Sequence, residues 1–167
     1  MSYQIPENET KRLEALWSYR ILDSPEEEVF NDIVKLATTV TGVSRAIITL
    51  LDRERQWFKA AVGVDFRETP RDFALCNQTI CAGETVVVND TTKDERFRDH
   101  PLVVSDPYVR FYAGAPMVDR YGNALGSVCV VDVKPRSISN EAVEGLSALA
   151  RNAMAFIEVR HASEKLS

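Results

Sequence analysis

Cysteine and histidine are the residue types in this chain that most readily bind metal ions or act as nucleophiles. Cys76 and Cys81 are five residues apart in a segment with helical periodicity, which separates them by about 140° around the helix axis. Two side chains in that arrangement cannot ligate one metal ion or form a redox pair. His100 lies in a predicted loop and His161 near the end of the last predicted helix, with no third ligand at a metal-binding spacing. We therefore expect no metal site.

The clearest candidate for a binding surface is a predicted β-hairpin at residues 110–132. Side chains alternate across a strand, so one face of this hairpin carries apolar residues that suit packing under helices. These are Phe111, Ala113, Ala115 and Met117. The other face carries small or polar residues, namely Arg110, Tyr112, Gly114, Ser127 and Cys129. This second face leaves volume either for a ligand or for Phe97 and its loop, and both alternatives stay open.

Three further residues are candidates for ligand contact beside this face. Asp90 follows a predicted strand and precedes two threonines, so it either contacts a ligand or forms an Asx turn. Asp94 either contacts a ligand or caps a short helical turn. Cys76 begins the short helix that would border the pocket, and a small redox enzyme that uses its thiol is one alternative function.

The motifs and the charge of the chain favour a binding or signalling module over an enzyme. The sequence contains no G-x-S-x-G nucleophile motif, no H-E-x-x-H motif and no glycine-rich phosphate loop. We therefore assign no catalytic residue. The net charge of −5 argues against a nucleic-acid binder, which would present a basic face.

Length and composition indicate one globular domain. The 167 residues are 45% hydrophobic and 27% charged, which is typical of a domain with its own core. No window approaches the roughly 20 apolar residues of a membrane span. The polar N-terminus lacks the pattern of a signal peptide, and an odd number of cysteines favours a reducing compartment. We expect a cytoplasmic protein without membrane contact.

Hydrophobic periodicity predicts the elements that would position the candidate residues. Helices are expected at 13–21, 25–41, 75–82 and from Ser139 onward, and strands at 46–51, 56–62, 85–88, 110–118 and 124–133. Ser24, Pro25 and Glu27 form a predicted capping box that opens the second helix. The apolar stripe of that helix is predicted to be Val29, Ile33, Leu36 and Val40, widened by Phe30, Val34 and Ala37. This order predicts an α+β fold with a largely antiparallel sheet.

The chain resembles GAF domains of bacterial signalling proteins. The resemblance rests on residues 110–117 and 122–132 of the hairpin, on 75–80, and on 89–91, Asp94 and 96–97. Residues 22–27 resemble the start of such domains in sensor histidine kinases and diguanylate cyclases. The resemblance implies a six-stranded antiparallel sheet, with helices packed on one face and a ligand pocket on the other.

The resemblance also sets the expected domain limits and function. Residues 25–161 would form the GAF domain, after an N-terminal helix and connector at 1–24 and before a tail at 162–167 that leads to an output kinase or cyclase domain. The motifs that mark cyclic-nucleotide, bilin and methionine-sulfoxide-reductase members are not recognisable, so the ligand and any cofactor stay unknown. We expect a small-molecule sensor that signals through its terminal helices; the alternative is a ligand-free dimerisation module.

The last predicted helix carries a candidate dimer seam. Its members alternate in steps of three and four, as in a coiled coil: Val143, Leu146, Ala150, Ala153 and Ile157. The same pattern also fits one wide stripe that faces the core of the domain. The seam predicts a homodimer, whereas the wide stripe predicts only intramolecular packing.

Overall fold

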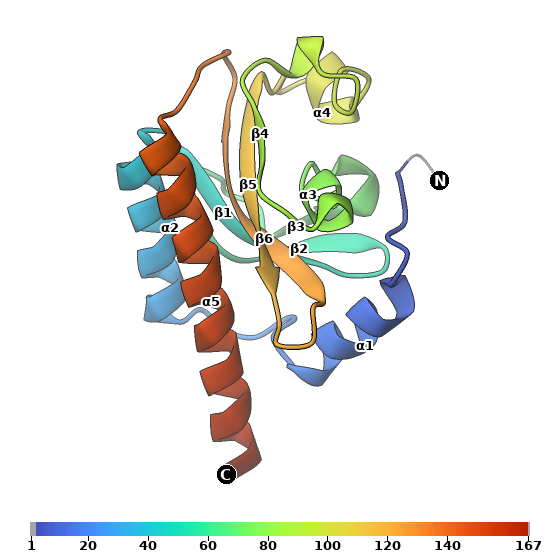
Figure 1. The fold of residues 1–167 in the computed structure, drawn as a ribbon, viewed down its shortest axis with the longest axis vertical. Helices are drawn as coiled ribbons and strands as arrows, with labels where there is room; N and C mark the ends of the chain where they lie inside the picture. The colour runs from blue at the N-terminus through green and yellow to red at the C-terminus, as the bar shows by residue number, and fades with distance from the viewer. Residues whose placement is uncertain (1–2, 167) are drawn as a thin grey trace.

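The computed structural model describes residues 3–166 as a six-stranded antiparallel sheet with helices on both faces (Figure 1). The strand order is β3-β2-β1-β6-β5-β4. The strands are β1 (Arg45–Leu51), β2 (Arg55–Val62), β3 (Glu68–Pro70), β4 (Val86–Val88), β5 (Phe111–Val118) and β6 (Ala124–Asp132). Residues 1, 2 and 167, at the ends of the predicted segments 1–24 and 162–167, lie outside the described residues.

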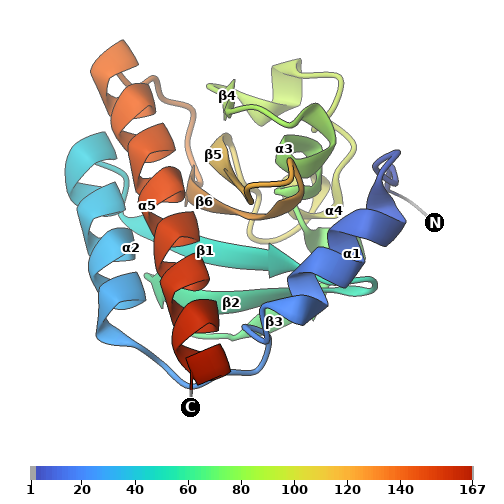
Figure 2. The same cartoon turned by 60° about the horizontal axis from the view of Figure 1, so that its bottom comes forward.

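Two long helices cover one face of the sheet, and two short ones lie over the other (Figure 2). The helices are α1 (Glu9–Ser18), α2 (Glu28–Thr41), α3 (Asn77–Ala82), α4 (Pro101–Val104) and α5 (Asn140–Leu166), with 3₁₀ turns η1 (Arg71–Phe73) and η2 (Thr91–Lys93). The helices α2 and α5 pack side by side against the sheet. No helix within residues 3–166 has the length and apolar character needed to cross a membrane.

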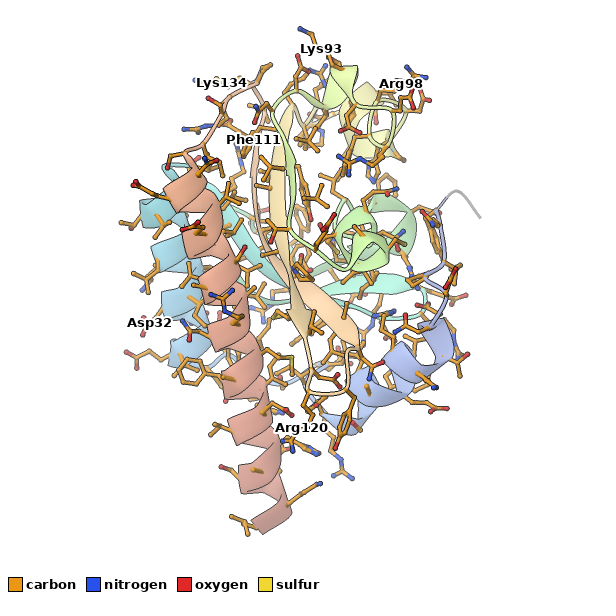
Figure 3. The ribbon with its side chains drawn as sticks, in the orientation of Figure 1. Asp32, Lys93, Arg98, Phe111, Arg120 and Lys134 are labelled. Atoms are coloured by element: carbon orange, nitrogen blue, oxygen red, sulfur yellow. The ribbon has the colours of Figure 1, made fainter. Side chains whose placement is uncertain are left out.

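The predicted fold class is confirmed, and so are the faces of the β5–β6 hairpin. Phe111, Ala113, Ala115 and Met117 are buried in the main hydrophobic core. Figure 3 shows where Phe111 lies. Leu13 and Leu16 of α1 belong to the same core. The N-terminal helix, which was expected to precede the GAF domain, therefore packs as part of the domain. The strand β3 was not predicted, because it has only three residues and ends in a proline.

The predicted capping box at Ser24 is wrong. The helix α2 begins at Glu28, and neither Ser24 nor Glu27 caps it with its side chain. Both side chains instead accept hydrogen bonds from Lys59 Nζ, at 2.8 Å for Ser24 Oγ and 2.6 Å for Glu27 Oε2. Lys59 lies at a bulge, where the β1–β2 register skips it, and the bulge directs its side chain to the helical face.

The apolar stripe of α2 is also rotated from the predicted one. Its buried residues are Phe30, Ile33, Val34, Ala37 and Thr41. Val29, Leu36 and Val40 are exposed instead, with Leu36 49% accessible. Both stripes have helical spacing, and contact with the sheet and α5 decides which one is buried.

The predicted dimer seam on α5 is wrong for four of its five members. Leu146, Ala150, Ala153 and Ile157 are each at most 1% exposed and belong to the core of their own domain, and Val143 is half-buried. Side chains already covered by the sheet and α2 cannot contact a second chain. The stripe is therefore the core-facing one. The predicted helix start is confirmed, because Ser139 Oγ accepts a hydrogen bond from the Ala142 amide at 3.0 Å.

Candidate functional site

A cavity of about 500 Å³ lies on the face of the sheet opposite α2 and α5. Its walls come from the strands β1, β2, β5 and β6 and from two segments, residues 63–76, which include β3 and η1, and residues 102–109, which begin in α4. Most of the lining is apolar: Ile47, Phe58, Val64, Phe66, Phe73, Leu75, Leu102, Val109, Tyr112, Val131 and Val133. Apolar walls with a few polar groups are typical of small-molecule sites, and this volume suits a ligand of drug-like size.

The buried polar side chains of the cavity wall are a neutral carboxamide, Gln56, and a carboxylate, Asp132, which is paired with Arg136. Gln56 is 6% exposed and lies between two partners on the cavity wall. Its Oε1 accepts a hydrogen bond from the Cys76 thiol at 2.9 Å, and its Nε2 donates to Thr69 Oγ1 at 3.1 Å. A carboxamide can make more than these two bonds, so Gln56 keeps hydrogen-bonding capacity for a ligand.

Three of the eight predicted ligand-binding residues line this cavity: Cys76, Tyr112 and Cys129. The Tyr112 hydroxyl lies 2.6 Å from Thr79 Oγ1, which fixes the ring. Phe97 is fully buried with its ring centroid 5.5 Å from that of Tyr112. Phe97 therefore fills the space beside Tyr112, as one alternative proposed, while the space over β1, β2 and β6 stays open.

The other four predicted residues have structural roles outside the cavity. Ser127 is fully buried, with its Oγ 3.0 Å from Thr49 Oγ1. Arg110 donates to the Val103 carbonyl at 2.9 Å and so holds the end of α4. The carboxylates of Asp90 and Asp94 accept bonds from backbone amides two residues on, in the Asx-turn and capping arrangements that were the alternatives to ligand contact.

Comparison with known proteins identifies the family. The sequence profile of the GAF domain matches residues 25–157. The chain belongs to the GAF domain family. It is 40% identical over 153 residues to a cyclic di-GMP phosphodiesterase of Pseudomonas aeruginosa, an alignment that takes in 91% of this chain and 26% of the relative. The chain thus spans about a quarter of that relative's length. This GAF domain is a sensory or regulatory module of a signalling protein.

Solved structures share the fold at low sequence identity. The GAF domain of an Acinetobacter phosphoenolpyruvate-protein phosphotransferase has a TM-score of 0.67 and 20% identity, with 93% of this chain and 98% of that one covered. A free methionine-R-sulfoxide reductase of Neisseria meningitidis, in complex with its substrate, has a TM-score of 0.65 and 15% identity, with 96% of each chain covered. The same fold therefore occurs in regulatory domains and in an enzyme.

Sequence reasoning missed several apolar residues of the GAF cavity wall. Val64, Phe66 and Phe73 come from the segment after β2, which the sequence presents only as a polar loop with a proline. One signal was available on β2 itself. Gln56 and Phe58 are two residues apart, so they lie on the same face, and that face lines the cavity.

Three titratable groups in or next to the cavity are held in their neutral forms: Cys76 and Tyr112 of the wall, and His100, which is bonded to the lining residue Leu102. Burial raises the pKa of the Cys76 thiol to about 11 and that of the Tyr112 hydroxyl well above its ordinary value. Burial also lowers the pKa of His100 to about 4, and its Nδ1 accepts a hydrogen bond from the Leu102 amide. Residues 3–166 contain no cluster of three or more histidine, cysteine or acidic side chains able to hold a metal ion.

Alkylation of the folded protein should therefore modify one cysteine. The thiolate is the reactive form, and burial raises the pKa of Cys76 and Cys129 and covers both sulfur atoms. Cys81 is half-buried and more accessible. With iodoacetamide at pH 7.5, mass spectrometry should show one adduct on Cys81 in the folded protein and three adducts after denaturation. Modification of Cys76 as fast as Cys81 would contradict this and would favour the redox alternative.

Proposed function

We propose that this GAF domain binds a small molecule in the cavity over β1, β2 and β6 and regulates an attached output domain through its terminal helices. The observation that carries the proposal is the cavity itself, with apolar walls, an open volume of about 500 Å³ and the neutral polar group of Gln56. The raised pKa of the Cys76 thiol supports a binding role over thiol catalysis, because the thiolate is the nucleophilic form. The relative from Pseudomonas supports a cyclic di-GMP phosphodiesterase as one type of output domain.

One chain of contacts connects the cavity to the C-terminal helix. Phe58 lines the cavity, and the next residue is Lys59, which is fully buried and bonded to Glu27. The same carboxylate oxygen of Glu27 accepts a hydrogen bond from Arg160 Nε of α5 at 3.0 Å. A ligand that displaces Phe58 would thus also move Lys59. Lys59 is bonded to Glu27 at the start of α2, and Glu27 is bonded to Arg160 of α5. This gives ligand binding a physical route to α5.

A second chain of contacts leads to the N-terminal helix. The cavity residue Phe73 ends the short 3₁₀ turn that Arg71 begins, and the cavity residue Leu75 lies two positions after it. The guanidinium of Arg71 is paired with Glu9 in the first turn of α1. Movement of the 71–76 segment would therefore act on α1 through a buried ion pair.

Filling the cavity should abolish ligand binding without unfolding the domain. The substitution Val131→Trp places an indole in the cavity, whereas Val118→Trp adds the same group at a half-exposed site outside it. Native mass spectrometry of freshly purified protein should show a bound small molecule in the wild type and Val118→Trp and none in Val131→Trp. Retention of the molecule by a folded Val131→Trp would contradict binding in this cavity, and no bound molecule in any of the three would favour a ligand-free module.

The second candidate function is dimerisation through α5, and the exposed end of this helix favours it. The last turns of α5 extend beyond the other elements (Figure 1). Phe156, Val159 and Leu166 are exposed there at a and d positions of one heptad pattern, and Leu166 is 90% accessible. We propose these residues as the contact with a second copy of the chain, in place of the buried stripe.

Two glutamate substitutions distinguish the proposed dimer contact from the buried stripe that faces the core. Val159→Glu should leave the domain folded and shift it to monomer, because the side chain is 60% exposed. Ala150→Glu should unfold the domain, because it buries a carboxylate in the core. Light scattering after size exclusion measures the mass, and circular dichroism measures the fold. A dimer that persists in Val159→Glu would exclude this contact.

A further inference from the structure

The charges around the cavity indicate which class of ligand it would bind, provided that the proposed function holds. Four carboxylates lie among the residues that line the cavity: Asp65, Glu68, Asp106 and Asp132. Arg45 is the one residue with a positive charge among the described residues of this lining. The cavity therefore presents an excess of negative charge to anything that enters it.

Two of these carboxylates are already neutralised by ion pairs. Asp132 accepts a bond from Arg136 at 2.8 Å, and Glu68 one from Arg55 at 3.1 Å. Asp65 and Asp106 differ, because both are exposed and their side chains have no hydrogen bond or ion pair with any residue from 3 to 166. They come from the two loops that border the cavity, so they are available to a bound molecule.

The aromatic rings of the lining suit the same kind of ligand. Phe58 and Phe66 lie with ring centroids 5.6 Å apart, and Phe73 and Tyr112 line the same cavity. Phe66 and Phe73 are 51% and 37% exposed, so their rings have surface left for contact with a ligand. Aromatic faces attract cations and stack on planar apolar groups.

An anionic ligand fits these observations poorly. Phosphate and carboxylate groups are normally bound by several arginine or lysine side chains or by the first amides of a helix. The described lining supplies one guanidinium against four carboxylates, and its buried polar residues are the neutral Gln56 and Asp132, which is already paired with Arg136.

We infer that the cavity binds a hydrophobic amine, a molecule with an aromatic or aliphatic body held by the apolar walls and a positively charged group that lies between Asp65 and Asp106. Gln56 hydrogen-bonds a neutral polar group of the same molecule inside the cavity. The ligand is neither a nucleotide nor another phosphate compound.

Three probes with one ring system test this inference: 2-naphthylmethylammonium, 2-naphthalenemethanol and 2-naphthoate. Their dissociation constants are measured by calorimetry with the whole chain at pH 7 and 50 mM salt. We expect the ammonium probe to bind about ten-fold more tightly than the naphthoate, with the alcohol between them, from the combined effect of the rim carboxylates and the aromatic faces. Salt at 500 mM should reduce the difference.

The double substitution Asp65→Asn with Asp106→Asn should bring the ammonium and alcohol probes to equal affinity while the affinity for the alcohol stays unchanged. Asp32→Asn, on α2 at the opposite face of the sheet (Figure 3), is the matched control and should keep the preference. Tighter binding of the naphthoate than of the ammonium probe, or a preference unaffected by the double substitution, would overturn the inference and leave the proposed function standing. Failure of all three probes, with native mass spectrometry showing no bound molecule, would overturn both.

Discussion

Replacing Gly126 with valine is expected to abolish folding of this domain. Gly126 lies in β6, where it pairs with Leu50 of β1 on one side and Met117 of β5 on the other. A Cβ atom at this position would be 1.8 Å from the Thr49 carbonyl oxygen and 2.9 Å from Leu50 Cα. Both are backbone atoms of a central strand, so no rotation of a side chain relieves the overlap. Opening the β1–β6 pairing would cost at least about 4 kcal/mol, a large part of the stability of a domain of this size.

Circular dichroism and expression in the soluble fraction measure the effect of Gly126→Val. The matched control is Gly122→Ala in the β5–β6 turn, where a Cβ would meet no atom within 4 Å. Its φ of +85° is unfavourable for alanine, so we expect a loss of only about 1 kcal/mol, seen as a lower melting temperature with the fold retained. A folded Gly126→Val protein with a melting temperature near that of the control would show that β6 lies farther from β1 than the structure places it.

Replacing Arg71 with methionine is expected to destabilise the domain by about 3–5 kcal/mol. The substitution removes the positive charge and the hydrogen-bond donors that the buried partners of Arg71 require. The Arg71 side chain is 1% exposed. Its guanidinium donates to Asn77 Oδ1 from Nε at 3.2 Å and from Nη2 at 3.1 Å, and to the Arg53 carbonyl at 3.1 Å. It is also paired with Glu9 of α1. Methionine has a similar length but donates no hydrogen bond, so α1 and the 71–76 segment would both lose their attachment.

Urea unfolding measures this loss, and two variants make the result specific. Arg98→Met removes an exposed arginine and should change the free energy of unfolding by no more than about 0.5 kcal/mol. Arg71→Lys keeps the positive charge but lacks the planar fork that reaches Asn77 and Glu9 together, so it should recover only part of the loss. Equal stability of Arg71→Met and Arg98→Met would show that the buried ion pair does not hold α1 to the domain.

Local patterns in the sequence predicted the α+β fold class and five of the six strands. Alternation along β5 separated the core face with Phe111 and Met117 from the face with Tyr112, and the structure confirms both. Gly42 and Gly83 end their helices in the left-handed region, as a residue without a Cβ does most easily. Each of these features depends on residues close together in the chain, so the sequence carries the information directly.

The errors concern residues whose partners are far away in the chain. Ser24 and Glu27 have the spacing of a capping box, but Lys59, more than 30 residues later, binds both side chains. A charged group with no access to water needs partners, and this requirement outweighs the preference of serine for a helix start. The α5 stripe fits a coiled coil equally well in sequence, and only the position of α2 and the sheet shows that Ala150 is inside.

The face of the sheet that carries the cavity shows the same division. Alternation along β5 and β6 determined which side chains share a face, and it placed Tyr112 and Cys129 correctly at the cavity. Only the tertiary structure decided that Phe97 fills one part of that face and that the segments at 63–76 and 102–109 enclose the other. A strand fixes side-chain direction through its own geometry, whereas the shape of a cavity depends on long-range packing of loops that have no periodic signal of their own.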